Sequence, residues 1–105
     1  MPPGYFGSGE KMKVSDLLSS EDKWCRNAYA RCADGKPVGV YSKKAEMYDL
    51  SGAINYCYPN HKHRRQIKES IMNVLGSRYN SVHHFNDLKK TDFSDIETIV
   101  RNLGI

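Results

Sequence analysis

Two close pairs of histidines are the residues best suited to bind a metal ion. His61 and His63 form one pair, His83 and His84 form the other, and Asp87 is a further possible ligand. A zinc site needs three or four ligands, usually at a recognisable spacing, and that spacing is absent. His83 and His84 point apart in an extended segment, and His61 and His63 project about 200° apart on a helix. We therefore predict hydrogen-bonded or solvated histidines, with no metal and no cofactor.

The three cysteines carry no signature of a catalytic nucleophile, which needs an oriented base beside it. Cys57 falls on an apolar stripe, so we expect it in the core, as is common for cysteine. With Cys25 and Cys32 the chain has three cysteines, an odd number, and no C-x-x-C pair. It also has no secretory signal, so we predict reduced thiols and a cytoplasmic location. There is no phosphate-binding glycine motif. The sequence therefore indicates no enzyme of a familiar type.

The segment Phe85-Asn86-Asp87 is the best candidate for a polar site. Asparagine and aspartate before a helix commonly close turns by binding backbone amides, and this structural role is the first interpretation. The functional interpretation places Asn86 and Asp87 with Arg31 in a polar cluster beside Trp24. Those four residues are the predicted binding site for a partner protein.

A basic run opens the segment from 61 to 68 and suggests a second kind of partner. Lys62, Arg64, Arg65 and Lys68 are the candidate contacts to nucleic-acid phosphates, and the neighbouring Tyr56-x-Tyr58 pair can stack bases. The alternative is a solvated helix face. A formal net charge of +4 favours encounter with anions in general and does not choose between nucleic acid and an acidic protein.

These residues must be positioned by elements on both sides of a predicted β-hairpin. The turn Asp34-Gly35-Lys36-Pro37 separates a first arm, residues 24–32, from a returning arm, Pro37 to Tyr41. Alternation in the first arm is imperfect, so a helix from 24 to about 30 remains an alternative. The two valines and the tyrosine of the second arm favour a strand.

Four helices are expected around this hairpin. They cover residues 11–20, residues 42–57 with Ser42 as N-cap, residues 61–76, and a last helix that begins at Thr91 or Asp92. Gly52 costs roughly 1 kcal/mol in a helix, so we expect another element to approach it closely. Residues 77–90 are predicted to form a structured loop. The last helix should bury Phe93, Ile96, Ile99, Val100 and Leu103, and the third should bury Ile67, Ile71, Val74 and Leu75.

The predicted fold class is therefore α+β, a small domain of about four helices packed around a hairpin. Residues 1–10, with two prolines and three glycines, are predicted to be a flexible tail in which Tyr5-Phe6 either docks or awaits a partner. Residues 11–105 suffice for one domain. No run approaches the roughly 18 apolar residues of a membrane span, so we expect no membrane partner.

Several short motifs occur in an order that is more specific than any one of them. They are Trp24, Ala28-x-Ala30-Arg31, Gly35, Val38, Ala45, Leu50-Ser51-Gly52-Ala53-Ile54, Phe85-Asn86-Asp87 and Thr91. This order resembles an uncharacterised family of small bacterial and phage-encoded domains over about residues 15–103. The chain departs from the family pattern at Cys32, at Tyr48-Asp49 and at Phe85, where aspartate, Trp-Cys and tryptophan are expected. The resemblance supports a single domain and implies no activity.

The leading hypothesis is thus a non-catalytic domain that binds another protein, as a phage or mobile-element accessory factor. Its basis is small size, missing catalytic signatures and aromatic residues such as Tyr41 and Tyr79 in predicted loops, since aromatic residues are enriched at interface hot spots. The alternative is a small basic nucleic-acid-binding protein. The oligomeric state is left open.

Overall fold

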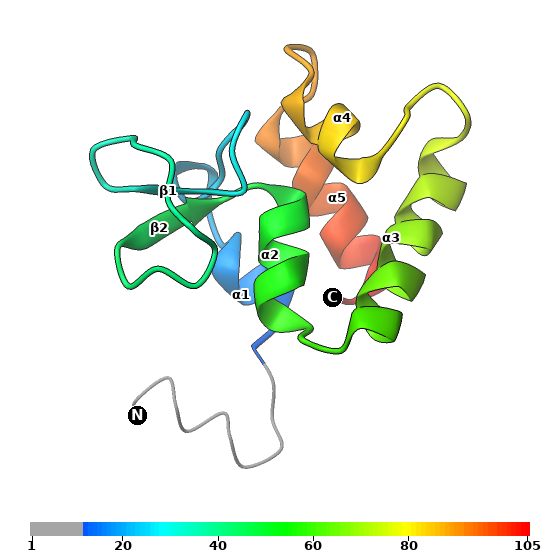
Figure 1. The fold of residues 1–105 in the computed structure, drawn as a ribbon. Coiled ribbons are helices and arrows are strands. Elements are labelled where there is room, and N and C mark those ends of the chain that lie inside the picture. The colour runs from blue at the N-terminus through cyan, green and yellow to red at the C-terminus, as the bar shows by residue number, and fades with distance from the viewer. Residues whose placement is uncertain (1–11) are drawn as a thin grey trace.

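A computed structural model describes residues 12–105 and has the α+β architecture predicted. The described chain contains five α-helices, one 3-10 helix and a two-stranded antiparallel sheet. Figure 1 shows the sheet at one side of the molecule and α3 at the other, with α2 and α5 between them. The elements in chain order are α1 (Val14–Leu17), η2 (Glu21–Lys23), β1 (Ala30–Cys32), β2 (Ala45–Tyr48), α2 (Leu50–Cys57), α3 (His61–Leu75), α4 (Val82–Asp87) and α5 (Phe93–Leu103).

The sheet pairs β1 with a later segment than predicted. Ala30 lies opposite Tyr48, and Cys32 lies opposite Ala45 after an irregularity in the ladder. The predicted returning arm, Pro37 to Tyr41, contributes only an isolated bridge between Pro37 and Arg31. Proline has no amide hydrogen to donate, which weakens that arm as a ladder strand. The prediction of this arm as a strand was wrong.

The predicted turn is confirmed at the tip of β1. Gly35 has φ +91°, a left-handed conformation that glycine adopts without a Cβ clash, and its amide donates to the carbonyl of Cys32. The Asp34 carboxylate accepts from the Lys36 amide at 3.1 Å. Residues 24–29 form no helix, so the helical alternative for the first arm is also wrong.

The second helix begins later than predicted because residues 45–48 are needed in the sheet. Asp49, not Ser42, is the N-cap, and its carboxylate accepts a hydrogen bond from the amide of Gly52. The close approach predicted at Gly52 is confirmed, since a Cβ there would overlap the backbone carbonyl of Tyr29. The Asp49 amide also donates to the Tyr29 carbonyl at 3.1 Å. Strand β1 and helix α2 are thus held together through backbone atoms.

The two long helices largely follow their predicted bounds. α3 has Asn60 as N-cap and ends at Gly76, and it buries Ile67 and Ile71. Val74 is 64% exposed, which contradicts its predicted burial. α5 opens with a reciprocal capping box between Asp92 and Asp95, which satisfies two otherwise unpaired amides. Its predicted face is buried at Ile96, Ile99 and Val100, while Phe93 and Leu103 are half-buried.

The segment predicted as a loop, residues 77–90, contains a further helix. Ser81 caps α4 by accepting from the amide of His84 at 3.0 Å, and Val82 and Phe85 are buried. Two apolar residues three apart give too short a periodic signal for a helix to be predicted. The first helix is shorter than predicted, and Tyr5-Phe6 lies outside the described residues.

The core lies between α2 and the elements around it. α2 contacts α1, α3 and α4. The apolar stripe predicted for this helix, Met47, Leu50, Ala53, Ile54 and Cys57, is buried from Leu50 onward, whereas Met47 lies in β2 and is half-buried. Burial raises the pKa of the Cys57 thiol to about 12, in keeping with a cysteine that serves as a core residue. Among residues 12–105, no helix combines the length and the apolar character needed to cross a membrane.

Candidate functional site

Helix α4 turns Asn86 into the interior, where every polar group of its side chain is paired. Asn86 Oδ1 accepts from Trp24 Nε1 at 2.7 Å and from the Leu50 amide at 3.0 Å. Its Nδ2 donates to the Cys25 carbonyl at 3.1 Å and to Asp87 Oδ1 at 3.0 Å. Asn86 has no exposed surface. One amide therefore ties together the Trp24 segment, the start of α2 and α4.

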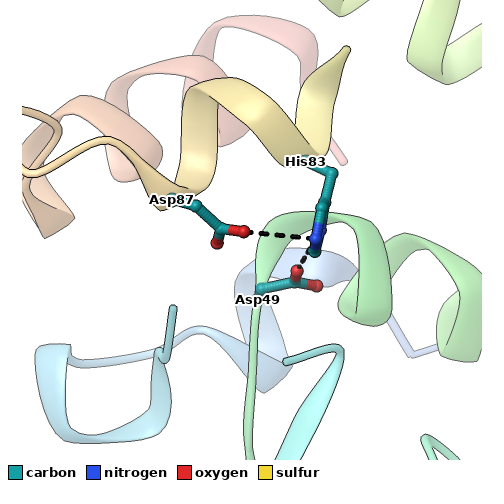
Figure 2. A group of neighbouring side chains, drawn as sticks. All are labelled: Asp49, His83 and Asp87. Carbon is teal, nitrogen blue, oxygen red and sulfur yellow. Dashed lines mark hydrogen bonds and ion pairs between the residues drawn. The ribbon is translucent and has the colours of Figure 1, made fainter. Parts of the chain in front are cut away.

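Helix α4 also presents His83 and Asp87, one turn apart, to a carboxylate from another element. Figure 2 shows Asp87 and Asp49 approaching the ring of His83 from α4 and from the turn before α2. Asp49 Oδ2 lies 2.9 Å from His83 Nδ1, and Asp87 Oδ2 lies 3.1 Å from His83 Nε2. We refer to these three residues as the Asp49–His83–Asp87 cluster. It brings Asp49 together with two residues of α4 that lie 34 or more positions later in the sequence.

Burial differs strongly within the cluster. The Asp49 side chain is fully buried, that of Asp87 is 19% exposed and that of His83 is 40% exposed. Removal from water raises the pKa of the Asp49 carboxyl to about 6, although the Gly52 amide and His83 act in the opposite direction. Burial of a carboxylate is tolerated when it is paired and hydrogen-bonded, and Asp49 meets both conditions. His83 is the member that solvent or a ligand can reach.

A backbone hydrogen bond and a ring contact hold the cluster in place. Asp87 Oδ1 accepts from the amide of Asn27 at 2.8 Å. Asn27 has φ +63°, a left-handed conformation that asparagine adopts more readily than most residues. The ring of Tyr29 packs on that of His83, with centroids 5.1 Å apart. The segment between Trp24 and β1 thus orients both members contributed by α4.

His83 lies at the edge of a cleft of about 1100 Å³. The cleft is lined by residues of α2, by α3 from His61 to Asn73 and by residues 80–83 at the start of α4, with Tyr29 and Tyr41 from the sheet side. Three of its cations, Arg64, Arg65 and Lys68, come from α3. We call this feature the basic cleft. Glu69 is the one carboxylate among its described lining residues.

The structure brings three of the four residues predicted to bind a protein into contact, because Asn86 is hydrogen-bonded to both Trp24 and Asp87. Trp24 and Asn86 are buried and bonded to each other, and Asp87 belongs to the cluster. The fourth residue, Arg31, has other partners: its guanidinium donates to the carbonyls of Arg26 and Gly35 and so fixes the turn after β1. The polar groups of Trp24 and Asn86 are thus used within the domain.

Three of the four residues predicted to contact nucleic acid lie on one cleft. Arg64, Arg65 and Lys68 line the basic cleft, whereas Lys62 is exposed outside it. The tyrosines expected to stack bases do not line this cleft: Tyr58 is half-buried against His63, and the tyrosines that line the cleft are Tyr29 and Tyr41. Tyr56 packs between Tyr41 and Tyr48.

Asp49 and Tyr29 are the site residues that sequence reasoning missed. The spacing of His83 and Asp87 gives the signal for a shared helix face, but only once residues 82–87 are known to be helical. No sequence pattern connects Asp49 to them, because that contact depends on the packing of α2 on α4. Chemically, the three side chains offer an imidazole and two carboxylates, the donor types of zinc and other divalent transition metals.

Comparisons with known proteins identify the family. The model of a family of unknown function, DUF6197, matches residues 12–103. No curated protein and no solved structure matches the chain. The match covers every described helix and strand, including the segments that form the cluster and the basic cleft. The chain therefore belongs to the DUF6197 family.

Proposed function

We propose that the domain binds single-stranded nucleic acid in the basic cleft. The observation that carries the proposal is that Arg64, Arg65 and Lys68 face one concave space and none of them forms an ion pair with a carboxylate among residues 12–105. Even Glu69, which lines the same cleft, forms no ion pair within that range. Cations left without an acidic partner in a concave site favour an anionic ligand.

Two of the cations, Arg64 and Lys68, are held in place by neutral acceptors, which leave their charge uncompensated. Arg64 Nη1 donates to the carbonyls of Tyr58 and Pro59, at 3.2 and 3.0 Å. Lys68 Nζ donates to Asn55 Oδ1 at 3.0 Å. Burial lowers the pKa of the Lys68 ammonium, and the charge of Arg64 adds to that effect. A phosphate in the cleft would oppose both effects on this pKa, because an opposite charge favours the protonated ammonium.

Two tyrosines on the other wall provide surfaces for bases. Tyr29 is 51% exposed and Tyr41 is 66% exposed, and the Tyr41 hydroxyl donates to the Asn55 carbonyl at 2.9 Å. Base stacking on an aromatic ring contributes roughly 1–3 kcal/mol per base and tolerates any sequence. A single strand has bases free to stack, whereas a duplex does not. The combination of α3 cations and exposed rings therefore favours a single strand.

The test is fluorescence anisotropy with a labelled oligothymidine over a series of salt concentrations. Replacing Arg65 and Lys68 by glutamine should weaken binding at least tenfold. Since each phosphate contact to a single strand contributes about 0.7 to the salt slope, the slope should fall by roughly 1.4. The control variant replaces Lys43 and Lys44 by glutamine; both are exposed and lie outside the cleft. It removes the same net charge and should leave the salt slope nearly unchanged.

The outcomes separate this function from the protein-binding alternative. Equal loss in the two double variants would show that binding depends on net charge and would contradict a cleft site. Polyglutamate is the probe for an acidic protein segment. If polyglutamate binds the chain and oligothymidine does not, and the R65Q/K68Q variant loses that binding, the cleft is a protein site and the nucleic-acid proposal fails.

A further inference from the structure

We propose that His83 and Asp87 bind a divalent transition-metal ion of the zinc type, with Asp49 orienting the imidazole. This inference goes beyond nucleic-acid binding and stands without it. The first observation concerns the charges of the Asp49–His83–Asp87 cluster. Two carboxylates come together with an imidazole so that one ligand atom from each residue lies within 4.8 Å of the others. Neither carboxylate forms an ion pair with a lysine or arginine among residues 12–105.

A positive charge between the two carboxylates would stabilise them, because like charges at this distance disfavour ionisation of both. A proton on the imidazole or a metal ion can supply that charge. The two nitrogens of an imidazole point in nearly opposite directions, so carboxylates aligned on both would stay far apart. Here the Asp49 and Asp87 ligand atoms lie within 4.8 Å of each other, and Figure 2 shows both carboxylates converging on the same ring.

The two contacts of the ring differ in kind. Asp49 Oδ2 and His83 Nδ1, 2.9 Å apart, form a hydrogen bond. Asp87 Oδ2 and His83 Nε2 have the separation of an ion pair, 3.1 Å, without the alignment of a hydrogen bond. When Nδ1 donates to Asp49, the proton occupies that nitrogen and Nε2 carries a free lone pair. A buried carboxylate behind a histidine is the usual arrangement that presents Nε2 to a metal.

The Nε2–Oδ2 separation fits two ligands of one ion. With metal–ligand bonds of about 2.1 Å, two atoms 3.1 Å apart subtend about 95° at the metal, between the octahedral and tetrahedral ideals. Mixed imidazole and carboxylate donors suit zinc, cobalt and manganese ions. The exposure of His83 and its place at the edge of the basic cleft leave the remaining coordination positions open to water or to a ligand oxygen.

The experiment titrates the full chain, first stripped with chelator, with Zn²⁺ by calorimetry and with Co²⁺ by absorption. The result expected is one saturable ion per chain, with cobalt ligand-field bands and no thiolate charge-transfer band, which excludes the cysteines as ligands. D87N should weaken zinc binding at least tenfold. The matched control E69Q removes an exposed carboxylate from the same cleft and should bind normally.

D87N is expected to fold, because an asparagine Oδ1 still accepts from the Asn27 amide and from Asn86 Nδ2. Its melting temperature in chelator verifies this. H83Q should also abolish the site, whereas H61Q, at an exposed histidine of the cleft, should not. Absence of a stoichiometric ion in the wild type, or equal affinity in wild type and D87N, would overturn the proposal.

Asp49 acts as a positioning residue, which a second variant tests. Asparagine is a good N-cap, so D49N keeps the bond from Gly52 and the start of α2. Its amide nitrogen would instead donate to His83 Nδ1 and move the ring proton to Nε2. D49N should therefore weaken zinc binding while nitrogen NMR of His83 reports the other tautomer. An unchanged tautomer and unchanged affinity would leave Asp49 with its capping role alone and contradict the orientation argument.

Discussion

Asn86 and His83 lie one turn apart on α4, yet their surroundings satisfy them in different ways. Asn86 is buried and makes four hydrogen bonds within the domain. His83 is 40% exposed, contacts two carboxylates and borders a cleft whose cations have no acidic partner in the described chain. Polar groups of the first kind define the fold. Those of the second kind retain charge that a ligand can use.

The largest effect on stability is expected at the interior network. N86A would leave the Trp24 indole N–H, the Leu50 amide and the Cys25 carbonyl without their partner. An unsatisfied buried group costs about 1–3 kcal/mol, so we expect a loss of about 4 kcal/mol in the free energy of unfolding. Urea denaturation measures this loss. The control N73A changes an exposed asparagine of the cleft and should stay within about 0.5 kcal/mol. A loss below 1 kcal/mol for N86A would contradict the structural role.

Cys25, whose carbonyl binds Asn86, tests how closed this interior is. Burial, helped by the charge of Asp49, raises the pKa of its thiol from 9.0 to about 11. At pH 8 the folded protein should therefore alkylate at Cys25 about 100-fold more slowly than the urea-unfolded chain, as mass spectrometry of iodoacetamide-treated samples would show. Between pH 9 and 11 the native Cys25 thiol keeps its proton, whereas the unfolded thiol loses it. The contribution of Cys25 to the free energy of unfolding therefore falls as pH rises through that range. Similar rates in the two states would show that this side of the domain opens readily.

A smaller loss of stability is expected for G52A, at the contact between the segment before β1 and α2. The Cβ of G52A would overlap the backbone carbonyl of Tyr29, which has little room to move. Forced overpacking costs about 1–3 kcal/mol, whereas helix propensity alone predicts a gain of about 1 kcal/mol. Thermal unfolding gives the sign directly. G39A, where an added Cβ would meet nothing within 4 Å, is the control and should be nearly neutral. Stabilisation by G52A would show that the contact relaxes without cost.

Local sequence signals predicted the parts of this fold that depend on neighbouring residues. The Asp34-Gly35 turn, the start of α5 to within one or two residues, the bounds of α3 and the close approach at Gly52 all follow from such signals. The partner of β1 and the N-cap at Asp49 did not, because strand pairing across an intervening loop depends on tertiary packing that short patterns do not encode.

The candidate site shows the same division. The clustering of Arg64, Arg65 and Lys68 is local to one helix and was predicted, although their common cleft was not. The Asp49–His83–Asp87 cluster requires α4, a six-residue helix with little periodic signal, to dock on the start of α2. Asn86 was identified as a polar-site residue, but its complete set of buried bonds appears only when Trp24, Leu50 and Cys25 surround it.

The smallest effect on stability is expected from R65Q, and that small size is informative. Arg65 is exposed, lines the cleft and forms no ion pair among residues 12–105, so its charge contributes almost nothing to folding. We expect a change within about 0.5 kcal/mol in urea denaturation. The same variant should bind oligothymidine more weakly at low salt, with the salt slope reduced by about 0.7. A loss of stability well above that limit would place Arg65 with Asn86, among the residues that hold the fold. Unchanged stability together with weaker binding would show that the charge of Arg65 serves ligand binding and not folding.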